Sequence, residues 1–400
     1  MTAATARRLA ACAALASSLI AATAAAEPYL AVREGVLCSQ CHVNRTGGGK
    51  RTAFGVIYSQ TVMPHYKITV PEKRDGEERE PRGFFFDPHW GEHVSFGADL
   101  RFQNLTTFAA TTTWNDKPQT APAGNTFKIP VANLFVEASL FKEHLVVYVD
   151  ETVGPEGAAL REGFAMYREL PLHGYVKAGR FLLPYGLRFP DDATFVRDMT
   201  GFNYANQDLG VEIGAEPGAA FVHVSLTNGT QGGTDTNISK QVTATAGALF
   251  RPFRFALLYS YADGSTDKSS TVRHVGGAYA ALGIGRLAIL GEADLMRDYS
   301  GPGPASPPGS LPGKVTWQLA AYGEVDLLVY RGVNVRVAYD YQDPFFTLAS
   351  NGQRSRLTVG TEVFPIPFLG VGVFYYMRRD VPQHVTENQD QLIVQIHGFL

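Results

Sequence analysis

The sequence predicts an all-β fold: a transmembrane, outer-membrane type of antiparallel β-barrel with about sixteen strands, preceded by a small N-terminal segment. Three observations predict this architecture. Residues 1–26 have the form of an export signal, and residues 93–400 alternate repeatedly between apolar and polar side chains. The connections between the alternating stretches are short and long in turn, as in bacterial outer-membrane barrels.

Residues 1–26 are predicted to be a secretory signal peptide. Two arginines precede the small apolar run of residues 9–22, and residues 24–26 are alanines that suit cleavage after Ala26. A membrane anchor is the alternative, but the run is shorter than the ~20 residues that a spanning helix needs. Cleavage removes two arginines and no acids, so the formal net charge changes from −3 to −5. The mature sequence has no basic patch that would predict nucleic-acid binding.

The mature chain divides into three parts. Residues 27–66 contain two cysteines and a short glycine run, and we interpret them as a small plug or cap. Residues 67–92 begin with a dense mixture of both charge signs between prolines and are predicted to be a hydrated linker. Residues 93–400 form the predicted barrel. A soluble chain of about 370 residues would normally divide into several domains, each with its own hydrophobic core. A barrel of this length can remain a single domain, because its strands close on one another and need no central core.

Period-two alternation is the main evidence for the strands. In residues 94–102 one face reads Val, Phe, Ala, Leu, Phe and the other Ser, Gly, Asp, Arg, and residues 333–342 repeat the pattern. A soluble β-sandwich is the alternative explanation. The connections favour the barrel. Short turns are expected near residues 142–143, 171–173, 216–218, 251–253, 283–285, 331–332 and 365–367. Long connections are expected near residues 112–126, 187–207, 230–239, 263–270, 300–315, 343–353 and 381–389.

An even number of strands places both ends of the barrel on the side of the short turns. In bacterial barrels that side is periplasmic, so the N-terminal segment is predicted to start there. The polar face of the strands is predicted to line the lumen, where charges avoid the cost of contact with hydrocarbon. We expect its acids to solvate the lumen and to pair with a few bases such as Arg101 and Arg336. The acids are Glu137, Asp150, Glu212, Glu292, Asp294, Glu324, Asp326 and Asp340.

Residues 38–42, Cys-Ser-Gln-Cys-His, carry the strongest chemical signal in the chain. Because Cys12 leaves with the predicted signal peptide, the mature protein keeps only this pair, and a disulfide framework is excluded. C-x-x-C-H is the attachment motif of c-type haem, in which the thiols add to the two vinyl groups and the histidine binds the iron. The sequence therefore predicts one covalent haem c held by Cys38 and Cys41, with His42 as the proximal axial ligand.

Two other interpretations of the cysteine pair are weaker. A closed zinc site needs four ligands, and the mature chain has no further cysteine. A thioredoxin-like redox pair needs a surrounding βαβ unit, which the sequence does not predict. The sixth iron ligand stays open. We favour Met63, which would raise the reduction potential, over His65, which would lower it, and a lumen residue is a third option.

The residues around the motif resemble a known family. Residues 28–38 followed by Cys41-His42 and Phe54-Gly55 resemble the fused monohaem cytochrome–porin proteins, outer-membrane iron oxidases of the Cyc2 type, with their P-x-x-A…G-x-x-C-x-x-C-H pattern. The resemblance implies that the haem segment plugs a barrel of about sixteen strands. It also implies electron transfer from an extracellular donor, typically Fe(II), to a periplasmic c-type cytochrome, and hence an iron(II):cytochrome c oxidoreductase.

A second resemblance supports a different function. Residues 179–188 are similar to the strand and loop of anion-selective porins of the phosphate type. On this interpretation the protein is a solute channel in which the haem is secondary. A third interpretation is a component that docks a separate periplasmic multihaem partner.

Overall fold

The structure, a computed structural model, describes residues 27–68, 86–141, 144–154, 157–189, 191, 193–266, 269–307, 310–348 and 352–400. The predicted signal peptide lies outside these residues, as do residues 69–85 of the predicted linker. None of the described helices has both the length and the hydrophobicity needed to cross a membrane.

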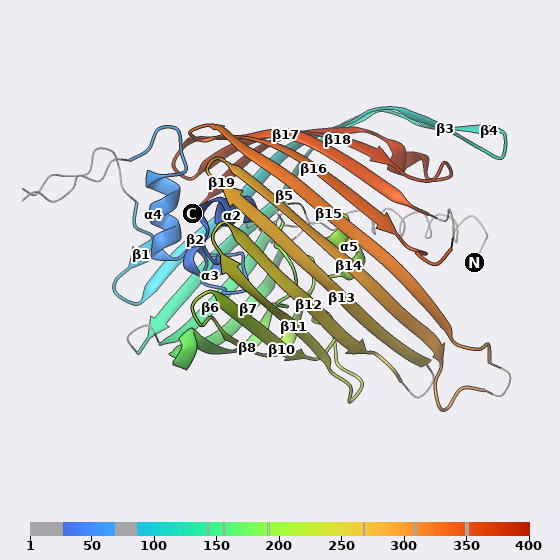
Figure 1. Ribbon diagram of the computed structural model, residues 1–400, viewed down its shortest axis with the longest axis horizontal. Helices are drawn as coiled ribbons and strands as arrows, with labels where there is room; N and C mark the ends of the chain where they lie inside the picture. Colours follow the sequence, from blue (N-terminus) through green and yellow to red (C-terminus); the bar gives the residue numbers. More distant parts are fainter. Residues whose placement is uncertain are drawn as a thin grey trace, which may run out of the picture.

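The described chain folds mainly into one large antiparallel sheet (Figure 1). The sheet has 17 strands; the two-residue β1 (His89–Trp90) only borders β2, and the other strands close a barrel. Successive strands pair along the chain, and β19 pairs with β2 to complete the circle. The barrel strands are β2 (Val94–Thr107), β5 (Gly124–Leu140), β6 (Leu145–Gly154), β7 (Gly157–Leu170), β8 (Gly174–Leu182), β9 (Gln207–Ala215), β10 (Ala220–Thr227), β11 (Gln241–Phe250), β12 (Phe253–Asp263), β13 (Ser269–Ile284), β14 (Leu287–Pro302), β15 (Lys314–Tyr330), β16 (Val333–Asp343), β17 (Arg354–Ile366), β18 (Leu369–Arg379) and β19 (Gln391–Phe399). The predicted sixteen-stranded barrel is confirmed.

The wall of the barrel has its apolar side chains on the outside. On β16, Val335 and Tyr339 are 38% and 50% exposed, whereas Asn334 and Asp340 are 2% and 0% exposed. A soluble sandwich would bury the apolar face and expose the polar one, so this arrangement excludes it. An apolar exterior around a polar interior is the surface that a membrane-spanning barrel presents to lipid.

The predicted alternation of connections is confirmed with one exception. Short turns join strands at one end of the barrel, and long connections join them at the other, apart from β6 and β7, whose tight turn between Gly154 and Gly157 lies at the long-loop end. The connection from β2 to β5 carries a hairpin of β3 (Ala110–Trp114) and β4 (Lys117–Ala121), which extends beyond the barrel (Figure 1). A short 3-10 helix, Val385–Asn388, lies in the connection from β18 to β19. Val94 and Phe399, the two ends of the barrel, are both on the short-turn side.

Residues 27–68, which we call the plug, lie at the short-turn end of the barrel: α2 (Pro28–Glu34) and α3 (Cys38–Cys41) are inside it, and α4 (Ala53–Thr61) lies at its mouth (Figure 1). The plug is anchored at or beside four of the short turns. The hydrogen bonds are from Arg45 to the His173 carbonyl, from Ser39 to Glu216, from Arg251 to the Glu34 carbonyl, and from the His65 N–H to the Phe364 carbonyl. These contacts hold the N-terminal segment across one mouth of the barrel.

A second segment also occupies the lumen. Residues 183–206, which we call the inward loop, connect β8 to β9, and their helix α5 (Phe195–Thr200) lies inside the barrel (Figure 1). Arg197 of α5 forms buried ion pairs with Glu292 and Asp294 of β14. The sequence predicted a long connection here, and the structure adds that it folds inward.

All eight acids that the sequence assigned to the lumen are buried in the barrel interior. The expectation of few bases is wrong, because a larger set of buried cations balances these acids. The pairs are Lys50–Glu137, Arg161–Asp150, Lys177–Glu212, Arg197–Glu292, Arg336–Asp326 and Arg356–Asp340. Charges from the plug and from the inward loop therefore help to hold both segments against the wall.

Candidate functional site

The predicted haem motif forms one tight structural unit within the plug. Residues 38–41 make the single turn of α3, and the backbone N–H of His42 donates to the Cys38 carbonyl at 2.9 Å. One helical turn brings the two half-buried thiols to neighbouring positions on the same side of the chain. Neither cysteine is in a disulfide. Both thiols are therefore available to one ligand.

The glycine run that follows the motif orients the histidine. Gly47, Gly48 and Gly49 have φ values of 100°, 93° and 72°, so the chain turns back sharply in a conformation that other residues rarely adopt. As a result the Gly49 carbonyl lies 3.1 Å from Nδ1 of His42. A carbonyl at that nitrogen favours the tautomer with the proton on Nδ1, which leaves the lone pair of Nε2 for a metal.

Burial and the charge of Arg51 lower the pKa of His42 to about 4. The imidazole is therefore neutral at physiological pH, which is the form that binds iron. Burial, with a contribution from Cys38, raises the pKa of Cys41 to about 11. Reactive cysteines in redox pairs have the opposite shift, so the thioredoxin-like alternative gains no support.

The motif faces a cavity between the plug, the inward loop and the barrel wall, which we call the inner cavity. Met63, 7% exposed, lines the same cavity, so the structure brings the favoured sixth ligand together with the motif. His65 is not among the described residues that line it, and its ring contacts Tyr66 and Tyr330. The rest of the wall is largely apolar, with cationic side chains beside it. These lining residues include Leu30, Val36, Phe54, Leu187, Phe221, Arg51, Arg188 and Arg254.

The residues of the inner cavity fit a c-type haem. Two free thiols, a neutral histidine and a buried thioether are the donors that such a group takes from a protein, and the apolar wall suits a porphyrin face. Arg254 lies 3.8 Å from the Cys38 sulfur, and Arg188 borders the cavity from the inward loop.

A second and larger cavity, which we call the vestibule, reaches from the long-loop end down to the plug. Arg354, Arg378 and Glu387 line its upper part, whereas Glu362 and Glu27 lie at its floor. Glu27 lines the inner cavity as well. The sequence analysis did not single out Glu27, Glu362 or the nearby His397, because no motif connects residues that only closure of the barrel brings together.

Comparisons with known proteins support the fold alone. The sequence matches no protein-family model and no curated protein. One similar solved structure is the loop L8 deletion mutant of OmpT, an outer membrane protein of Vibrio cholerae, with 14% sequence identity, coverage of 77% of this chain and 99% of that chain, and a TM-score of 0.53. A second is an anion-selective porin from Comamonas acidovorans, with 10% identity, coverage of 77% of this chain and 99% of that chain, and a TM-score of 0.54. A third is the outer membrane channel DcaP of Acinetobacter baumannii, with 10% identity, coverage of 77% of this chain and 97% of that chain, and a TM-score of 0.52. The chain thus has the porin-like barrel fold of outer-membrane channels.

Proposed function

We propose that this protein is an outer-membrane cytochrome–porin fusion that transfers electrons across the outer membrane. The observation that carries the proposal is the convergence of Cys38, Cys41, His42 and Met63 on one cavity inside a membrane-type barrel. The apolar outer wall suits contact with outer-membrane lipid. The short-turn end, where both barrel termini lie, faces the periplasm in this arrangement, and the long loops face the outside.

Each part of the chain has a defined task in this proposal. Cys38 and Cys41 would tether a haem, and His42 with Met63 would hold its iron. A haem bound in this way supplies one-electron redox chemistry. The plug and the inward loop exclude bulk water from the inner cavity, and the vestibule admits an extracellular donor, for which we propose Fe(II). A periplasmic c-type cytochrome at the plugged end is the proposed acceptor, either a single-haem protein or a docked multihaem partner.

Fe(II) suits the side on which the vestibule opens. Ferric iron precipitates at neutral pH, and a donor oxidised within the vestibule releases its product through the long-loop end, outside the cell. The corresponding activity is that of an iron(II):cytochrome c oxidoreductase.

The test is to purify the protein from outer membranes and to examine it for haem that survives denaturing electrophoresis. We expect one haem per chain in the wild type. Cys38→Ser or Cys41→Ser should reduce the amount of haem that stays with the chain, and replacement of both cysteines should abolish it. Stopped-flow mixing with Fe(II) should then reduce the haem and sharpen its α-band. A colourless protein would reject the haem, whereas a haem that dithionite reduces and Fe(II) does not would reject only the iron donor.

A solute porin with a haem cap is the second candidate. It is favoured by the porin-like fold and by the six cationic side chains that line the vestibule, Arg101, Lys128, Arg336, Arg354, Arg356 and Arg378. The anchored plug argues against it. Planar bilayers discriminate the two functions: a plugged conduit passes little ion current, and conductance typical of an open porin would favour transport.

A further inference from the structure

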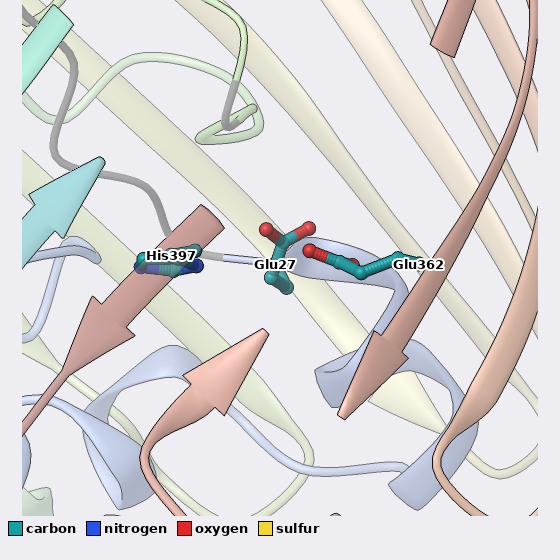
Figure 2. A group of neighbouring side chains, drawn as sticks. All are labelled: Glu27, Glu362 and His397. Carbon is teal, nitrogen blue, oxygen red and sulfur yellow. The ribbon is translucent and has the colours of Figure 1, made fainter. Parts of the chain in front are cut away.

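Three metal-ligating side chains from distant parts of the sequence meet at the floor of the vestibule. Glu27 directly precedes α2, Glu362 lies on β17 and His397 lies on β19. One ligand atom of each lies within 4.8 Å of the other two, and Figure 2 shows Glu362 and His397 approaching Glu27 from opposite sides. Glu362 and His397 are 4% and 2% exposed. The cluster is therefore a built feature of the interior, with Glu27 between the vestibule and the inner cavity.

The histidine of the cluster has an unused nitrogen. Nε2 of His397 lies 3.1 Å from Oδ1 of Asp99, and neither ring nitrogen has a hydrogen-bond partner of suitable geometry among the described residues. In a neutral imidazole one of the two nitrogens carries a lone pair, and a carboxylate beside Nε2 favours the tautomer with the proton on that nitrogen. Metal-binding histidines commonly have a carboxylate beside the nitrogen that does not bind the metal, which fixes the tautomer and raises the basicity of the ligating nitrogen.

The charges around the cluster leave room for a cation. Five carboxyl groups and three guanidinium groups gather here, so the acids outnumber the bases; they are Glu27, Glu362, Asp99, Glu324 and Asp326 with Arg51, Arg101 and Arg336. Arg336 is shared among three carboxylates, at 3.0 to 3.4 Å. Glu362 accepts a hydrogen bond from the Tyr29 hydroxyl at 2.8 Å, which positions its carboxylate without neutralising it.

We propose that Glu27, Glu362 and His397 bind a divalent first-row transition metal ion. Two carboxylates and one imidazole are a donor set that suits Fe(II), Mn(II) and Co(II). Donors about 2.1 Å from an ion lie at most about 4.2 Å apart, so side-chain movements of a few tenths of an ångström complete the site. This inference rests on the proposed function. The site would hold Fe(II) from the vestibule, which would give one electron to the oxidised haem held by Cys38, Cys41 and His42 and so become Fe(III).

The test uses Mn(II) with the purified, haem-loaded full-length protein in detergent. The electron paramagnetic resonance signal of free Mn(II) should fall until one ion is bound per chain. Binding should weaken about 10-fold or more in Glu362→Gln and in His397→Gln. Glu387→Gln is the matched control, because Glu387 also lines the vestibule but pairs with Arg378, and it should bind as the wild type does. An unchanged haem spectrum and heat-modifiable migration confirm that each variant is folded.

The metal site is overturned if the wild type does not bind Mn(II), or if the wild type and the three variants bind it with equal affinity. Glu27, Glu362 and His397 would then be part of the ion-pair network around Arg336. Rates of haem reduction by Fe(II) separate this failure from that of the proposed function. Saturable reduction with the same half-saturating Fe(II) concentration in every protein rejects the site and keeps the conduit. Mn(II) binding without any reduction by Fe(II) keeps the site and rejects iron oxidation.

Discussion

Met63 is the residue on which the redox behaviour of the proposed haem depends most directly. It is buried, lines the inner cavity and packs against Phe364 and Phe399. Met63→His should lower the midpoint potential by on the order of 0.1 V, because a thioether ligand opposite histidine raises the potential and axial ligands span about 0.8 V across proteins. Spectroelectrochemical titration of the purified protein measures the shift.

His65→Gln is the control for this change, since His65 lies two residues away and outside the described lining of the inner cavity. It should leave the potential and the spectrum unchanged. If His65→Gln shifts the potential while Met63→His does not, the assignment of the sixth ligand is reversed.

Lys177 shows how the lumen charges depend on one another. It is fully buried, its Nζ lies 2.9 Å from Glu212 of the wall, and it donates to Asn44 of the plug at 3.1 Å. Lys177→Met should destabilise the protein by about 3–5 kcal/mol, because it leaves a buried carboxylate without its cation. The midpoint of urea unfolding in detergent measures the change. Adding Glu212→Gln should restore most of the loss, and a double variant no more stable than the single one would contradict the pairing.

Whether the sequence could predict that two residues share a site depends on their separation along the chain. Cys38, Cys41 and His42 belong to one contiguous motif, so their association could be predicted from the sequence alone. In the structure all three line one cavity. Glu27 and Glu362 could not be associated in this way. Their proximity requires the plug to enter the barrel, and no local pattern encodes that contact.

The strands and turns of the barrel were largely predictable, because alternation and turn residues are local properties of the sequence. The direction of the inward loop was not. It folds into the lumen because Arg197 forms ion pairs with Glu292 and Asp294 on β14. Asp191 also pairs with Arg356 on β17, with 2.8 Å between the carboxylate oxygen and the guanidinium nitrogen. These ion pairs join distant elements, and the loop sequence by itself is compatible with either side of the mouth.

The contact between α2 and the wall can be tested with a single methyl group. Gly283, at the end of β13, faces the backbone of Val32, and a Cβ at this glycine would overlap the Val32 carbonyl oxygen. Gly283→Ala should therefore displace the plug, at a cost of about 1–3 kcal/mol, and raise the frequency of open-channel events in planar bilayers about 10- to 100-fold.

Gly276→Ala is the matched control because it adds the same methyl group to the same strand, where nothing lies within 4 Å. Its bilayer recordings should match those of the wild type. Identical recordings from the two variants would mean that α2 does not restrict the lumen.

At the scale of the whole molecule, the two ends of the barrel are chemically different. One end has short turns and the plug with the C-x-x-C-H motif, and the other has long loops and the vestibule. The proposed donor and acceptor would therefore approach the inner cavity from opposite sides of the membrane. Which partner meets which end depends on the orientation in which the barrel inserts.

That orientation can be measured on intact cells with a membrane-impermeant maleimide. Ala305→Cys introduces an exposed thiol in the long connection between β14 and β15, and Leu172→Cys introduces one in the short turn between β7 and β8, where Leu172 is 66% exposed. Because long loops of bacterial barrels lie outside the cell, Ala305→Cys should be labelled on intact cells, and Leu172→Cys only after the outer membrane is permeabilised. The parent protein supplies the background. The reverse pattern would place the plug at the cell surface and would exchange the sides assigned to donor and acceptor.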